Sequence, residues 1–137
     1  MSTVTSTAVQ AGNHLQGHVG LQSIVVKYVA TGLTAASVIK AINLPHGFVV
    51  CDGWVVAPAD SFKLSVGPAA DQDRYIVSAT NTAVQLHRFS APGGMGDRIS
   101  LSSSAVIRHT TLDVLVGSAS ATGTFVVMVS GYNDGGA

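Results

Sequence analysis

The chain has no glutamate and very little charge of either sign. Only 10% of its 137 residues are charged, whereas about 25% is usual for a soluble domain. The 7 Lys and Arg balance 7 Asp, so the net charge is zero and no long-range repulsion keeps copies of the chain apart. We therefore expect other protein, and not water alone, to cover part of its surface. The composition is typical of a subunit of an assembly and not of a free enzyme.

The chain also has little cysteine. Cys51 is the only one, which excludes a disulfide within the chain. Its neighbours in the apolar run Phe48 to Val56 predict the inside of a strand. We therefore interpret Cys51 as a small buried apolar residue and not as a nucleophile or redox centre.

Targeting, membrane and nucleic-acid signals are missing as well. Residues 1–20 contain neither the basic nor the apolar region of a secretory signal. No stretch reaches the roughly 18 uninterrupted apolar residues of a membrane span. The Lys and Arg residues are scattered singly, which gives no basic footprint for a phosphate backbone. We expect a protein that is made in a cytoplasm, stays soluble, and binds neither nucleic acid nor membrane.

What the sequence does contain is a series of short apolar runs separated by Gly, Pro, Asn and Asp. This pattern predicts an all-β domain over residues 21–137, a jelly-roll-like β-sandwich of about eight strands. The segment Thr34 to Asn43 is ambiguous, but its β-branched second half and the following Pro45 favour a strand over a helix. The expected strands are Leu21 to Val29, Val38 to Leu44, Phe48 to Val56, Lys63 to Val66, Tyr75 to Ala79, Val84 to Phe89, Arg98 to Ser102, Leu112 to Val116 and Thr124 to Ser130.

Residues 1–20 form a second, smaller unit. They are small and polar and show neither the helical nor the strand period. Ordering such a segment costs about 20 to 40 kcal/mol of backbone entropy, so it needs a substantial surface to dock on. We predict an extended N-terminal arm that lies on an adjacent subunit or a neighbouring protein, with a disordered tail as the alternative.

Two of the expected strands, Phe48 to Val56 and Phe125 to Val129, are apolar on both faces. A strand of a two-layer sandwich has only one inward face, so its outward apolar side chains need a further cover. A neighbouring subunit is the simplest cover. Loops or the arm of the same chain are the alternative.

No combination of residues completes a catalytic, cofactor or metal site. His14 and His18 have the spacing of a zinc helix but lack the accompanying Glu and the helix itself. Asp71 and Asp73 could begin a calcium loop, yet the later acidic ligands are missing. The glycines of residues 93–96 lack the Lys that follows them in a phosphate loop. We predict that the chain is not an enzyme and holds no cofactor.

An aromatic platform for stacking sugars is a further possibility. Trp54, Phe48, Phe62 and Tyr75 could form one, but most of the few aromatic residues occupy core positions of the expected strands. We therefore interpret these four residues as core packing.

Three motifs resemble those of small virion proteins of tailed phages, of the capsid decoration or cement type. The first is Leu44-Pro45-His46-Gly47-Phe48-Val49-Val50 with Gly53 and Val55. The second is Leu64-Ser65-Val66-Gly67 followed by Arg74 and Tyr75, and the third is Val127, Val129, Tyr132, Asp134 and Gly135. The resemblance covers about Val25 to Gly135. It does not extend to the arm and is weak over residues 81–96. The sequence also departs from the family pattern at Ser130 and Gly131, which precede the closing tyrosine.

The resemblance implies a β-sandwich that trimerises on the exterior of a phage head and bridges neighbouring subunits of the major capsid protein. Its partners would be two further copies of itself and the capsid shell. The alternative is a tail- or fibre-associated receptor-binding module, in which loops such as Ala57 to Ser61 and Ala91 to Asp97 contact a glycan or a host protein. Exposed aromatic residues on those loops would favour that alternative.

Overall fold

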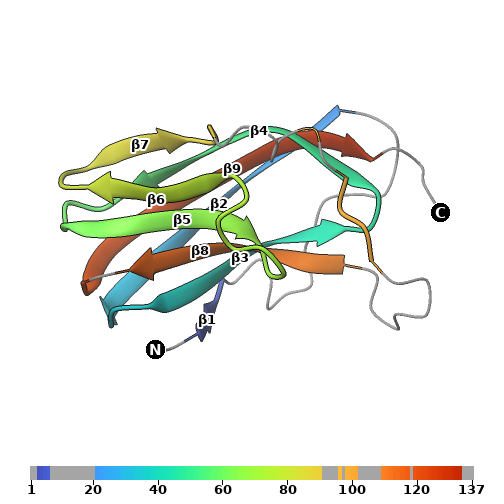
Figure 1. Ribbon diagram of the computed structural model, residues 1–137. Coiled ribbons are helices and arrows are strands. Elements are labelled where there is room, and N and C mark those ends of the chain that lie inside the picture. The colour runs from blue at the N-terminus through green and yellow to red at the C-terminus, as the bar shows by residue number, and fades with distance from the viewer. Residues whose placement is uncertain are drawn as a thin grey trace.

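A computed structural model describes residues 3–6, 21–90, 96, 98–101, 109–117 and 119–133. In these residues the chain is all-β, as predicted, and its strands form two facing sheets (Figure 1). The strands are β1 (Thr3–Thr5), β2 (Leu21–Leu33), β3 (Ser37–Pro45), β4 (Phe48–Ala57), β5 (Phe62–Pro68), β6 (Ile76–Asn81), β7 (Gln85–Arg88), β8 (His109–Gly117) and β9 (Ala121–Asn133).

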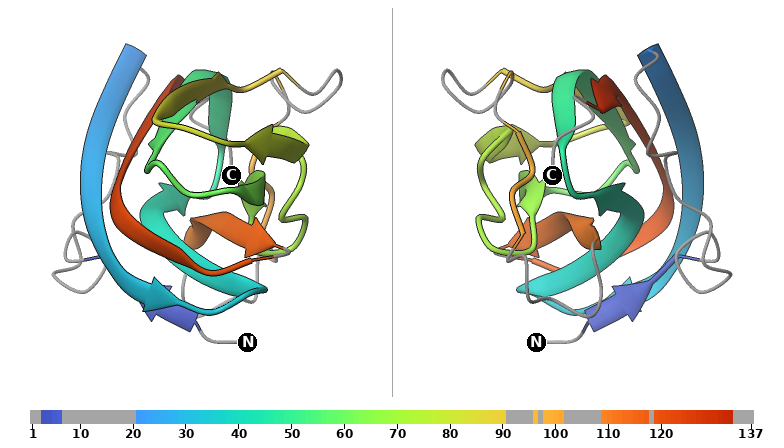
Figure 2. Two further views of the ribbon diagram at one scale, coloured as in Figure 1. Left: turned by 90° about the vertical axis from the view of Figure 1, so that its left-hand side faces the viewer. Right: turned by 90° about the vertical axis from the view of Figure 1, so that its right-hand side faces the viewer.

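The sandwich consists of a five-stranded sheet in the order β1-β3-β8-β5-β6 and a four-stranded sheet in the order β2-β9-β4-β7. All strand pairs are antiparallel except β1 with β3. Figure 2 shows the two sheets end-on, with β2 running along one outer side of the molecule. The jelly-roll-like sandwich expected from the sequence is thereby confirmed.

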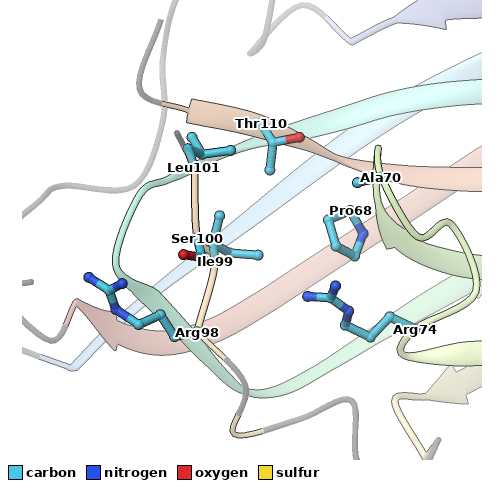
Figure 3. Close-up of a pocket in the computed structure, with 8 residues that line it drawn as sticks. All are labelled: Pro68, Ala70, Arg74, Arg98, Ile99, Ser100, Leu101 and Thr110. Atoms are coloured by element: carbon cyan, nitrogen blue, oxygen red, sulfur yellow. The ribbon is translucent and has the colours of Figure 1, made fainter. Parts of the chain in front are cut away.

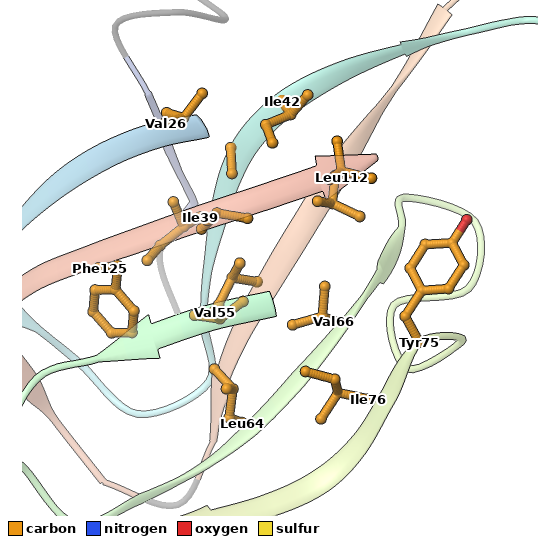
Figure 4. Packing of buried hydrophobic residues seen from close by; sticks show 14 of the residues in the cluster. Val26, Ile39, Ile42, Val55, Leu64, Val66, Tyr75, Ile76, Leu112 and Phe125 are labelled. Atoms are coloured by element: carbon orange, nitrogen blue, oxygen red, sulfur yellow. The ribbon is translucent and has the colours of Figure 1, made fainter. Parts of the chain in front are cut away.

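The core lies between the sheets and is made by alternate residues of every long strand. Val55 of β4, Phe125 of β9 and Leu64 of β5 are fully buried there (Figure 4). Tyr75 stacks on Phe89 with ring centroids 5.0 Å apart. This arrangement leaves the odd-numbered residues of β2 from Leu21 to Val29 and the even-numbered residues of β9 on the outside of the sandwich, and a register shift after Ala30 turns Leu33 inward.

The turns mostly match the sequence interpretation. His46 and Gly47 form the turn between β3 and β4, where Gly47 takes a φ of 86°, a value that glycine adopts without steric cost. The ambiguous segment is a strand from Ser37 onward, preceded by a turn in which Ala36 has a φ of 64°. Most of the expected connection at residues 92–97 lies outside the described residues.

One expected strand is wrong in its described part. Of the segment Arg98 to Ser102, residues 98–101 form only an isolated bridge from Arg98 to Val49. The segment is held instead at the β3–β4 turn, where the Leu101 N–H donates to Nδ1 of His46 at 2.9 Å. Backbone hydrogen bonds also join Ile99 to Gly47 and Phe48, and Gly96 to Val50, along the part of β4 that β7 leaves unpaired.

The described part of the N-terminal arm contacts its own chain. β1 pairs in parallel with β3, so that Thr5 lies beside Lys40. Ser6 is fully buried and donates its hydroxyl to the carbonyl of Ala41 at 2.7 Å. The four described arm residues therefore extend the five-stranded sheet at the β3 edge.

Candidate functional site

The most prominent surface feature is the outer side of the four-stranded sheet. The strand register places Val25, Met128 and Trp54 in one row across β2, β9 and β4, and Val126, Val56 and Leu86 in the next. On β2, β9 and β4 the chain neighbours of these residues belong to or pack against the core, and Leu86 of β7 is itself 54% exposed, so these side chains point outward. We call this surface the apolar face and define it as Leu21, Val25, Val29, Trp54, Val56, Leu86, Val126, Met128 and Tyr132.

The apolar face holds most of the exposed large apolar side chains of the described residues. Five of the seven belong to it, with exposed fractions from 40% at Tyr132 to 78% at Leu21. Of the two others, Val77 lies on β6 and Val84 directly precedes β7. A polar row of Ser23, Ser130 and Asp52 separates Leu21 and Tyr132 from the other members. Isolated exposed apolar residues are ordinary, but two adjacent apolar rows that reach across four strands mark an interaction surface.

The outer side of the five-stranded sheet is different, because polar residues and a loop of the same chain cover it. Residues 69–74 pass over β5 so closely that a Cβ on Gly67 would meet the Asp71 carbonyl at 2.0 Å. The Gln72 side chain donates to the carboxylate of buried Asp113 at 2.9 Å. One side of the sandwich thus has an intramolecular cover, whereas no described residue covers the apolar face.

Charge is sparse on and around the apolar face. Arg88 of β7 donates to the Asp52 carboxylate of β4 at 2.6 Å. Lys27 projects from β2, in the row of Val126 and Val56. The face therefore combines a broad apolar centre with a few charges, the usual anatomy of a protein–protein interface.

The structure corrects two sequence interpretations on β4. Cys51 is exposed and not buried, because it is the extra residue of a bulge where the pairing with β9 shifts between Val50 and Asp52. Trp54 does not belong to the core but lies half-buried on the apolar face. Phe48, Phe62 and Tyr75 are buried, so the expected core packing holds for those three aromatic residues and not for Trp54.

A small cavity of about 120 Å³ lies between the end of β5 and residues 98–101 (Figure 3). Ile99 and Pro68 contribute apolar surface to it, and the side chains of Arg74 and Arg98 lie at its border. Arg74 is paired with Asp71 at 3.4 Å. The lining contains neither a carboxylate nor a histidine, so it brings no acid–base pair together.

The remaining sequence candidates do not converge. His14, His18 and the glycines at 93 and 94 lie outside the described residues. Asp71 and Asp73 are exposed, and a hydrogen bond between their carboxyl groups raises the pKa of Asp73. In the described part of the chain there is no group of three or more potential metal ligands. The same residues contain no helix long and apolar enough to span a membrane.

Sequence reasoning did not identify the polar contact between His87 and Asn81 that ties β7 to β6. Asn81 is fully buried and donates to the carbonyls of Pro58 and Asp60, which turns its Oδ1 toward His87 Nε2 at 2.8 Å. The neutral ring must therefore carry its proton on Nε2. Partial burial lowers the pKa of His87. A lone histidine between short strands gives no signal from which this contact could be predicted.

No protein-family model and no curated protein matches the sequence. The fold, however, is similar to that of chains in two solved structures. One belongs to the capsid of Ralstonia phage GP4, with a TM-score of 0.76, 14% identity, and coverage of 98% of this chain and 99% of that one. The other belongs to the cyanophage Pam1 capsid asymmetric unit, with a TM-score of 0.63, 19% identity, and coverage of 87% and 89%. The chain therefore has a sandwich fold that is found in phage capsids.

Proposed function

We propose that the chain is a structural virion protein of the decoration or cement type, which binds the exterior of a phage head as a homo-oligomer and bridges subunits of the major capsid protein. The observation that carries this proposal is the apolar face. The likeness to chains of two phage capsids, over most of their length, supports a role in a virion. We propose a trimer on the grounds of the sequence resemblance.

We assign the apolar face to a second copy of the chain, on grounds of charge. Because the net charge is zero, copies approach one another without net repulsion. Trp54 and Tyr132 add the aromatic residues that are enriched at such contacts. A cover by copies of the chain also accounts for the low overall charge of the sequence.

Such a protein needs no catalytic step. An oligomer that binds only the assembled shell shifts the equilibrium away from ruptured or dissociated shells by mass action. Each contact can be modest, because many copies act together on one lattice. The receptor-binding alternative gains no support from the aromatic residues next to its two loops, since Phe62, beside residues 57–61, and Phe89, beside residues 91–97, are both buried.

The test of self-association compares two substitutions of the same kind. Val25 on the apolar face is 58% exposed and Val77 on β6 is 60% exposed, so an Asp at either position should cost the single chain little. We expect light scattering to give trimers for the unmodified protein and for Val77→Asp, and monomers for Val25→Asp. A monomeric unmodified protein, or equal behaviour of the two variants, would contradict the assignment of this face.

Shell binding is tested with capsids of the phage from which the gene for this chain has been deleted. We expect the purified protein to co-sediment with these capsids and to raise the temperature at which they release DNA. Val25→Asp should bind more weakly, because it loses the multivalency of the trimer. Absence of co-sedimentation would contradict the decoration role.

A further inference from the structure

The β1–β3 contact consists of a backbone ladder, to which Val4 adds packing against the core and Ser6 adds a buried hydroxyl. Val4 and Thr5 lie beside Ile39 and Lys40 in a parallel ladder. The Ser6 N–H donates to the carbonyl of Lys40 at 2.9 Å, and its hydroxyl donates to the next carbonyl. β3 can therefore accept an identical strand from any copy of the chain that reaches it.

We propose that, in the assembled oligomer, β1 of one copy pairs with β3 of its neighbour. This inference rests on the proposed self-association and adds a second contact between copies. Exchange keeps every β1–β3 hydrogen bond and transfers it across the interface. The docking free energy of β1 then contributes to association as well as to folding, which is why such exchange is a low-cost route to oligomers.

The length of chain between β1 and β2 permits this exchange. Ser6 lies beside Lys40 and Ala41, whereas Leu21 pairs with Tyr132 near the opposite end of β3. About six residues of strand and one sheet spacing separate the two points, roughly 25 Å in all. Residues 7–20 can span up to about 50 Å when extended. The connection is about twice as long as pairing within one chain requires.

The distance to a neighbour is within the same reach. A domain of this size has a radius of gyration of about 14 Å and hence a diameter of about 37 Å. The arm leaves one copy at Leu21 and has to end beside Lys40 of the next copy, and these two points lie within about one diameter of each other when the start of β2 faces the neighbour. An arm of about 50 Å can therefore reach the β3 edge of the next copy, and three such exchanges close a ring.

The size of the apolar face shows why a second contact is needed. Across nine positions of β2, β9 and β4 and the four residues of β7, a sheet covers a flat area of roughly 500 Å². A standard stable interface buries about 800 Å² on each partner. Strand exchange would add contact area at the β3 edge of each copy.

A cysteine pair distinguishes pairing within one chain from exchange between chains. Thr5→Cys and Lys40→Cys occupy directly paired positions, both partly accessible, and Cys51→Ser removes the native thiol. The matched control carries Lys63→Cys and Thr80→Cys, which are paired on β5 and β6 in the same chain. Both proteins are oxidised as native oligomers and then run on denaturing gels without reductant.

We expect covalent dimers and trimers for the arm pair and monomers for the control. Monomers with an internal disulfide in the arm pair, or free thiols at both of its positions, would overturn the exchange. Light scattering of the same samples before denaturation separates the two proposals. A native oligomer without covalent links contradicts only the exchange, whereas a native monomer contradicts the self-association on which it rests.

Discussion

At the scale of single residues, His87 couples stability to pH. Partial burial lowers the pKa of His87 below the value of about 6.5 expected in the unfolded chain. The unfolded chain therefore binds the proton more readily, and acid favours unfolding as the pH falls through that value. The neutral ring keeps its hydrogen bond to Asn81 without the cost of burying a charge.

We predict that the unmodified protein loses stability between about pH 7 and pH 5, and that His87→Gln loses less. Glutamine can donate to Asn81 but does not titrate. Urea unfolding at a series of pH values gives both curves, and their difference isolates His87 from the other histidines. Parallel curves for the two proteins would show that His87 does not contribute to this pH dependence.

At the scale of elements, most strands could be predicted because apolar runs that are separated by turn residues are a direct indication of strands. β1 could not, since the three β-branched residues Thr3–Thr5 are too short a run to indicate a strand and pair only because the edge of β3 is available to them. Nor could the bulge at Cys51, which arises from the register between β4 and β9. The contribution of β2 to the apolar face had a readable signal, because Leu21, Val25 and Val29 alternate with inward Ile24 and Val26.

The register predicts different consequences for two aromatic residues of the four-stranded sheet. Phe125→Ala, in the core, should reduce the free energy of unfolding by about 3 to 5 kcal/mol. Trp54→Ala should cost the single chain only about 1 kcal/mol, because Trp54 is half-buried, but should weaken self-association. Urea unfolding in the monomeric Val25→Asp background measures the first effect, and light scattering without that substitution measures the second. Equal losses of stability would place Trp54 in the core after all.

At the scale of the whole molecule, the two sides of the sandwich differ in what covers them. The five-stranded sheet carries its own polar loop, while the four-stranded sheet presents apolar side chains from all of its strands. Composition alone predicted that some surface is covered, and the runs Phe48 to Val56 and Phe125 to Val129 predicted which strands contribute. Only the sheet order shows that these strands are neighbours and form one continuous surface with β2 and β7.

This asymmetry predicts how the oligomer responds to salt. Raising the salt from about 0.1 M to about 1 M shortens the screening length from about 10 Å to about 3 Å, which weakens exposed ion pairs but not apolar contacts. The described ion pair at the apolar face, Asp52 with Arg88, lies within one chain. The mass measured by light scattering should therefore stay that of the oligomer across this range. Dissociation at high salt would mean that charges such as Lys27 hold the copies together and that the apolar face has another partner.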